Sequence, residues 1–156
     1  MDTFLTKLQV KGIGEATQKI SVVAAYEDFS TRARVNEFCH GLARDLGRDC
    51  EMLKQAWLGN LLRLPQLRAI AAQDATAADV IIISLHDAET VPEDVSGWIN
   101  IWLHEKGHRP KVLVGLFDVA YRDDVSAMQS SLEAVARQAN MEFFAQSWEM
   151  TEGRRS

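Results

Sequence analysis

The stretch DVIIISLH, residues 79–86, decides the fold class of this chain. It is a short run of β-branched and aliphatic residues with few polar interruptions, which is typical of a strand buried on both faces. KVLVGLF, residues 111–117, has the same character. Because strands of this kind belong to parallel sheets that helices cover from two sides, the two runs predict an α/β protein.

Three further runs of strand length extend the pattern, namely KISVVAAY (19–26), CEMLKQAWL (50–58) and MEFFAQSW (141–148). Helical patterns separate the five runs, over residues 30–47, 61–78, 91–107 and 123–140. Strict alternation of this kind predicts parallel strands joined by right-handed crossovers. We therefore expect a doubly wound, three-layer α/β/α sandwich of five parallel strands in the flavodoxin-like order 2-1-3-4-5. The run at 50–58 alternates more in polarity than the others, as an edge strand does.

Local signals predict where the helices begin and end. Ser30 or Thr31 is expected to cap the first helix, and Gly47 to end it. Pro65 is expected at the first turn of the second helix, since its ring suits that position. Asn140 is expected at the end of the last helix.

The totals describe an ordinary globular domain. The chain has 156 residues, 47% hydrophobic and 25% charged, which suits one domain. We divide it into a lead-in segment (1–18), one α/β domain (19–148) and a flexible tail (149–156). The net charge of −5, with dispersed arginines, argues against binding to nucleic acid or to an anionic membrane. No secretory signal is recognised and the two cysteines form no disulfide framework, so we expect a cytoplasmic protein.

The carboxyl ends of the strands are the expected binding region, since ligands of open parallel sheets bind there. The acidic and hydroxyl residues that follow the strands are Glu27, Asp28, Ser84, Asp87 and Asp118. Close carboxylates repel one another, and a divalent cation such as Mg²⁺ relieves this repulsion. The sequence therefore predicts a crevice that binds Mg²⁺ or another ligand. The alternative is that Asp28 caps the first helix and Asp87 lies in a solvated loop.

The chain resembles the receiver domains of bacterial two-component systems over most of its length. VVAAYED (22–28) is similar to their first strand with its acidic pair, which helps to hold magnesium, and Glu27 and Asp28 occupy that place. AADVIIISLHD (77–87) is similar to their third strand, whose end carries the phosphoaccepting aspartate. In this chain Ser84 stands there.

Three departures bear on activity. The hydroxyl of Ser84 is no carboxylate and forms no acyl phosphate. In PKVLVGLFD (110–118), which is similar to the family's fourth strand, Gly115 or Leu116 replaces a Ser or Thr. EFFAQSWEM (142–150) lacks the lysine expected after the fifth strand. The resemblance implies a bacterial-type pseudo-receiver that acts in regulation or protein interaction without aspartyl phosphotransfer. Asp87 is a substitute acceptor to be tested, and no cofactor besides Mg²⁺ is expected.

The segment HEKGH (104–108) has the letters of a zinc-peptidase motif, in which two His residues on one helix face bind the metal. On a helical wheel, His104 lies opposite the apolar stripe of its helix, and Gly107 is a helix stop that leaves His108 outside the regular turn. We therefore interpret His104, Glu105 and His108 as a chance match, with no zinc.

An enzyme is the alternative function. Toll/interleukin-receptor domains are similar in DVIIIS (79–84) and SGWINIWLHE (96–105), and the resemblance implicates Glu105 in NAD cleavage. A metal-dependent hydrolase at the strand ends is the other form of this alternative. A triad of Ser84, His86 and Asp87 is rejected, because the G-x-S-x-G turn is absent.

An apolar helix face predicts the partner surface. Trp98, Ile101, Trp102 and Leu103 widen the apolar stripe of the helix at 91–107. Such a stripe is usually core, but a helix that is apolar over most of its circumference also covers a second subunit. We expect a protein partner or a homodimer.

Overall fold

The computed structural model describes residues 19–47, 50–86, 91–105, 110–118 and 127–148. Its strands are β1 (Lys19–Tyr26), β2 (Glu51–Leu58), β3 (Val80–His86), β4 (Val112–Asp118) and β5 (Glu142–Trp148). Its helices are α2 (Phe29–Leu46), the 3₁₀ helix η1 (Gly59–Arg63), α3 (Pro65–Thr76), α4 (Glu93–Leu103) and α5 (Ala127–Gln138).

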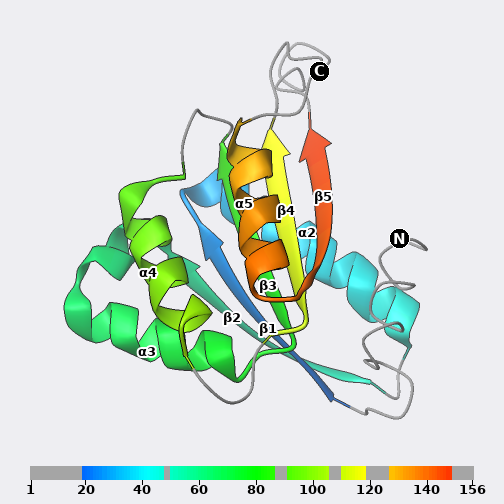
Figure 1. Ribbon diagram of the computed structural model, residues 1–156. Helices are drawn as coiled ribbons and strands as arrows, with labels where there is room; N and C mark the ends of the chain where they lie inside the picture. Colours follow the sequence, from blue (N-terminus) through cyan, green and yellow to red (C-terminus); the bar gives the residue numbers. More distant parts are fainter. Residues whose placement is uncertain (1–18, 48–49, 87–90, 106–109, 119–126, 149–156) are drawn as a thin grey trace.

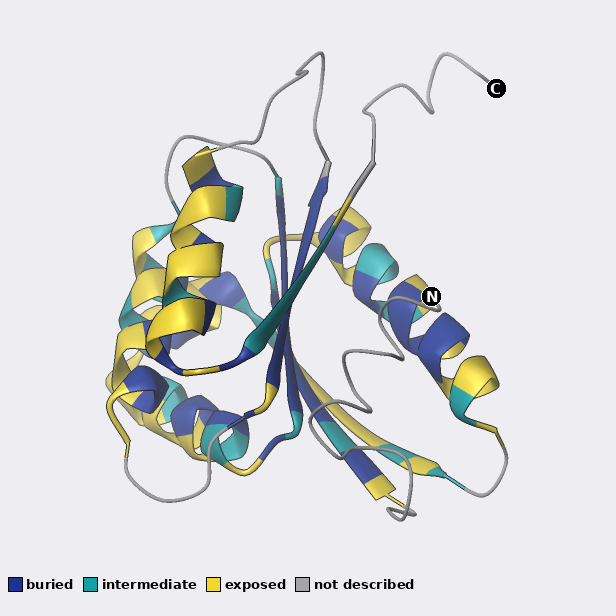
Figure 2. Cartoon of the chain, turned by 45° about the vertical axis from the view of Figure 1, so that its right-hand side comes forward, coloured by how far each residue is buried: buried dark blue, intermediate teal, exposed yellow. Residues whose placement is uncertain are grey.

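The described strands form one parallel sheet in the order β2-β1-β3-β4-β5 (Figure 1). Helix α2 packs on one face, and α3, α4 and α5 cover the other (Figure 2). The predicted three-layer sandwich with strand order 2-1-3-4-5 is confirmed. Alternation of strand and helix favours this result, because each helical crossover returns the chain to the end of the sheet at which the parallel strands begin.

The core has two parts, one on each face of the sheet. Odd-numbered residues of β3, such as Ile81 and Ile83, pack against α3, α4 and α5, whereas Val80 and Ile82 pack against α2. All of β3 from Val80 to Leu85 is buried, as its largely apolar sequence predicts. Strand β2 is mostly exposed or half-buried and lies at the edge, also as predicted.

The first helix is capped by Asp28, as the alternative interpretation predicted, and not by Ser30 or Thr31. Asp28 is the N-cap: its Oδ1 accepts from Thr31 N at 3.0 Å, and Thr31 Oγ1 accepts from Asp28 N at 2.8 Å. This reciprocal capping box leaves Ser30 and Thr31 inside the helix, since the Asp28 carboxylate accepts from the backbone N–H of the third helical residue. Gly47 ends the helix with φ of 91°, a left-handed value that glycine adopts without strain.

The packing of helix α4 differs from the prediction that its apolar side chains form an interaction face. Trp98, Trp102 and Leu103 are buried in the core, and the two indoles meet edge-to-face with centroids 6.0 Å apart. The apolar stripe is wide because α4 packs against both the sheet and α3. Of the four predicted residues, Ile101 is the exposed one. Three of the four residues predicted to form the partner face therefore belong to the core.

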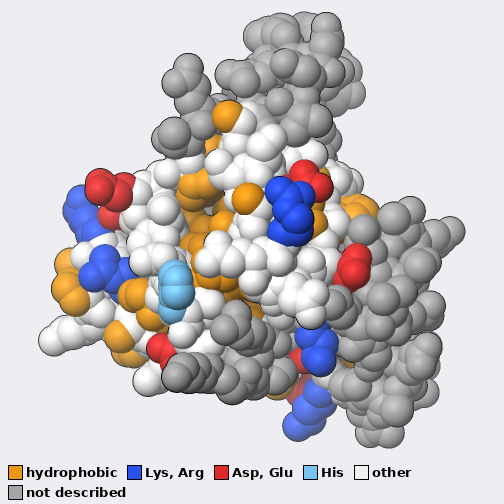
Figure 3. Space-filling model, in the orientation of Figure 1, with side chains coloured by type: hydrophobic (Ala, Val, Ile, Leu, Met, Phe, Trp, Pro, Cys, Tyr) orange, Lys and Arg blue, Asp and Glu red, His pale blue; other side chains and the backbone are white. Residues whose placement is uncertain are grey.

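The groove between α4 and α5 is the apolar hollow that Figure 3 presents, where hydrophobic side chains gather between the two helices. Its volume is about 320 Å³, and Gly97, Ile99, Leu103 and Val135 are among its lining residues. Within the described residues, no helix is both long and apolar enough to cross a membrane.

Candidate functional site

The ends of β1 and β3 bring the predicted crevice residues together. Tyr26 pairs with Ser84 in the parallel ladder, so the residues after β1 meet the last residues of β3 at the carboxyl edge of the sheet. Ser84 is 1% exposed, and its hydroxyl donates to the backbone carbonyl of Thr31 at 2.8 Å. Ser84 therefore joins β3 to the first turn of α2 and does not point to solvent.

Asp28 lies beside this contact and has several donors. Besides the backbone N–H of Thr31, its carboxylate accepts from the Ser30 hydroxyl at 3.1 Å, and Nε2 of His86 lies 2.6 Å from Oδ2. Partial desolvation raises the pKa of Asp28, but the donors from Thr31, His86 and Ser30 outweigh it and lower the pKa to about 2. Asp28 is therefore held as a carboxylate.

Glu27 also binds the end of β3. Its Oε1 accepts from the backbone N–H of His86 at 2.7 Å, while its own backbone N–H donates to Thr31 Oγ1 at 2.8 Å. The two acids thus contact His86 through its main chain and through its ring. No sequence motif predicted a role for His86. The signal for it was its position two residues after Ser84, which places both side chains on one side of β3.

Of the two remaining predicted acids, the structure describes only the backbone of Asp118. Asp118 ends β4 and pairs in register with His86, so its backbone lies at the same edge of the sheet; its side chain is outside the described part of the structure. Asp87 also lies outside the described residues. Among the residues that are described, no three His, Cys, Asp or Glu side chains form a group able to hold a metal ion. Magnesium binding stays a prediction.

A small cavity lies beneath this cluster. Ser30, Thr31, Arg34, Ser84 and Phe117 line it, and its volume is about 30 Å³. This is about the space of one water molecule, whereas small-molecule sites measure roughly 300–1,000 Å³. Beside this cavity, the residues at the ends of β1 and β3 therefore form a closed, hydrogen-bonded joint, made by Glu27, Asp28, Ser84 and His86.

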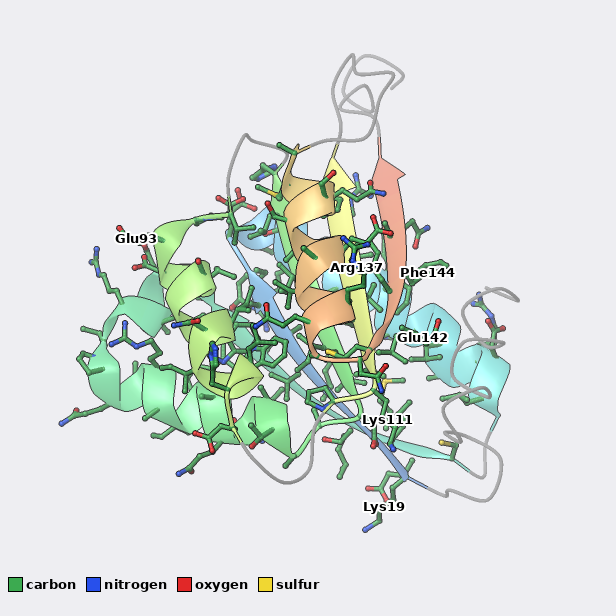
Figure 4. All side chains as sticks on the ribbon, viewed as in Figure 1. Lys19, Glu93, Lys111, Arg137, Glu142 and Phe144 are labelled. Carbon is green, nitrogen blue, oxygen red and sulfur yellow. The ribbon has the colours of Figure 1, made fainter. Side chains whose placement is uncertain are left out.

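The segment HEKGH begins at the other end of the sheet, where the amino-terminal ends of the strands lie. Helix α4 starts at Glu93 near the carboxyl edge and runs back, so His104 and Glu105 follow its end near the start of β4. Figure 4 shows that contrast: Lys111 lies at the edge where β4 begins, and Glu93 lies at the other end of α4.

His104 is the C-cap residue of α4 and is exposed, as the helical wheel predicted. Its Nδ1 donates to the Asn100 carbonyl at 2.8 Å, which satisfies a carbonyl of the last turn. His108 lies outside the described residues. Glu105, the residue implicated in NAD cleavage, is at the opposite edge from Ser84, so the two do not share a site.

No family model matches the chain, and no curated protein matches it in sequence. Among solved structures, the crystal structure of Smu.1420 from Streptococcus mutans UA159 is similar, with a TM-score of 0.59 at 8% identity. The match covers 86% of this chain and 89% of that chain. At such low identity the likeness shows the fold alone. The sheet order and the layers define a flavodoxin-like α/β fold.

Proposed function

We propose that this chain is a receiver-like regulatory module that binds a protein partner and carries out no aspartyl phosphotransfer. The observation that carries the proposal is the buried hydrogen bond from Ser84 to the Thr31 carbonyl. In the receiver domains that the chain resembles, the corresponding position holds the phosphoaccepting aspartate. A buried hydroxyl that is already bonded to the backbone has neither the carboxylate nor the exposure that this transfer requires.

The neighbouring acids support the same proposal. Asp28 caps α2 and contacts the His86 ring, and Glu27 accepts from the His86 backbone. A cation at this position has to compete with these hydrogen bonds for the same oxygens. The joint is therefore better suited to fixing α2 on the sheet than to holding a metal and a phosphoryl group.

The partner-binding part of the proposal rests on Phe29. This side chain is 84% exposed at the first position of α2, directly after Glu27 and Asp28. An aromatic ring in water contributes little to stability, whereas exposed aromatic rings are common anchors in protein interfaces. The acids beside it supply a polar rim. We assign the partner surface to this end of the sheet.

Two experiments test the proposal. The full chain is incubated with acetyl phosphate and Mg²⁺, beside a phosphorylation-competent receiver domain, and intact mass is measured. We expect a phosphoryl adduct on the competent receiver alone; an adduct on this chain, at Asp87 or elsewhere, refutes the phosphotransfer part.

The second experiment compares Phe29→Ser with Leu53→Ser, which changes an apolar side chain 47% exposed on β2. Cross-linking in cells that express each variant is followed by mass spectrometry. We expect one protein to be captured by the wild type and by Leu53→Ser and lost with Phe29→Ser. Equal capture by both variants rules out the Phe29 surface.

A further inference from the structure

A larger hollow lies beside β2, the edge strand of the described sheet, where this strand faces η1 and α3. Its volume is about 610 Å³, within the range of small-molecule sites. The side chains on which the inference rests are Tyr26, Gln55, Trp57, Leu61, Ile70 and Asp74. None of its lining residues belongs to the joint of Glu27, Asp28, Ser84 and His86, so the hollow is a separate feature of the fold.

One part of the hollow is apolar and open to solvent. Leu61 on η1 is 40% exposed and Ile70 on α3 is 49% exposed, and both line it together with Trp57 on β2. The apolar surface of these side chains is removed from contact with water only when something covers it. An apolar ligand therefore gains free energy by binding there. The volume and lining favour a compact ring or a short alkyl chain.

The other part is polar and carries a negative charge. Asp74 is the one charged residue among the described residues that line the hollow. The side-chain amide of Gln55 faces the Asp74 carboxylate, and the amide orientation that satisfies both groups is the one in which its nitrogen donates. The Trp57 Nε1 is buried and forms no hydrogen bond of good geometry with a described residue. Burial raises the pKa of Asp74, and the nearby Trp57 indole offsets this only in part.

We propose that this hollow binds a small primary amine with an apolar body, such as an arylalkylamine, whose ammonium group pairs with Asp74. An ammonium group supplies the opposite charge and three N–H donors, and a carboxylate accepts more than one of them. The apolar body lies against Leu61, Ile70 and the Trp57 ring. The ammonium is assigned to Asp74 because the ring of Tyr26 already faces a cation, the guanidinium of Arg32, 6.0 Å from its centroid.

The test uses the full chain and two matched probes, 2-phenylethylamine and its neutral analogue 2-phenylethanol. Binding is followed by NMR of the indole N–H groups, with the Trp57 signal assigned by its loss in Trp57→Phe. We expect 2-phenylethylamine to shift the Trp57 signal saturably and to bind about tenfold more tightly than the alcohol, as a charge-assisted hydrogen bond predicts. Absence of a saturable shift for the amine overturns the site, and equal affinity for the alcohol overturns the role of Asp74.

Two pairs of variants separate charge from folding. Asp74→Asn is expected to lose about tenfold in amine affinity, whereas Asp45→Asn, an exposed acid on α2, is expected to change nothing. Ile70→Lys places a cation one helical turn before Asp74 and is expected to compete with the amine; Ile70→Met, an apolar control at the same exposed position, is expected to retain binding. If Asp74→Asn and Ile70→Lys bind the amine as tightly as their controls, the assignment is wrong.

Discussion

The hydroxyl of Ser84 donates to the backbone carbonyl of Thr31 across 2.8 Å, and so joins the end of β3 to the first turn of α2. The two residues are 53 positions apart in the chain. Under the receiver-like function that we propose, Ser84 stands where a receiver domain carries its phosphoacceptor. Its chemistry therefore leads to the first prediction.

Ser84→Ala is expected to lower the free energy of unfolding by about 1 kcal/mol, because one buried hydrogen bond is lost. Ser84→Asp is expected to cost more, about 3 kcal/mol or above, because it buries a charge beside a carbonyl and near Asp28. Urea denaturation of the two variants measures the difference. Equal stability of Ser84→Asp and Ser84→Ala contradicts this, and recovery of Ser84→Asp on addition of Mg²⁺ reveals a cation site.

Asp28 predicts an acid-dependent loss of stability. Its pKa is about 2 in the folded chain, below the ordinary value of 3.8, so the folded state favours the carboxylate. The resulting stabilisation is complete above pH 3.8 and is lost as pH falls towards 2. Since half of the side chain is exposed, solvent screening reduces the effect to about 1 kcal/mol.

The measurement for Asp28 is the difference in unfolding free energy between the wild type and Asp28→Asn, taken from neutral pH down to pH 2 at constant ionic strength. The amide retains the shape of the cap but not the charge. We expect the difference to shrink in the window between the two pKa values. A difference that stays constant with pH shows that the charge of Asp28 does not contribute.

Gly115 and Gly97 form a matched pair with opposite expected effects. A Cβ at Gly115 in β4 lies 2.9 Å and 3.0 Å from ring atoms of Phe117, so Gly115→Ala is expected to destabilise by about 1–3 kcal/mol. At Gly97 in α4 the nearest atom is Nη1 of Arg68 at 3.8 Å, an ordinary contact. Gly97→Ala is therefore expected to stabilise by about 0.5–1 kcal/mol. Thermal unfolding by circular dichroism measures both; a stabilising Gly115→Ala contradicts the packing of β4.

The two thiols are expected to react at different rates. Burial raises the pKa of Cys39 to about 11, against a smaller opposing effect of Lys54, and its side chain is buried in the core. Burial and Asp79 raise the pKa of Cys50 too, but this residue is half-buried. Because thiolate and access control alkylation, iodoacetamide at mildly alkaline pH is expected to modify Cys50 first. Peptide mapping identifies the labelled thiol, and equal labelling of Cys39 indicates local opening of α2.

The fold could be predicted because its signals are local. The largely apolar run at 79–86 requires cover on both faces, and alternation with helices leaves few topologies once crossovers are right-handed. Pro65 and Gly47 mark their helix ends through backbone geometry that each residue sets by itself. The parallel direction of the strands likewise predicted that Glu27, Asp28 and Ser84 meet at the carboxyl edge of the sheet.

What these side chains do there was decided by tertiary contacts. The His86 ring reaches Asp28 across 58 positions of the chain, and Trp98 and Trp102 are buried because α3 and the sheet meet α4 on two sides. Sequence periodicity shows which face of an element is apolar, but the partners of a polar atom depend on the register between strands and on the cap of the neighbouring helix. The sequence by itself therefore determined the layers and the strand order, whereas the packed structure decided that the acids at the strand ends bind Thr31 and His86.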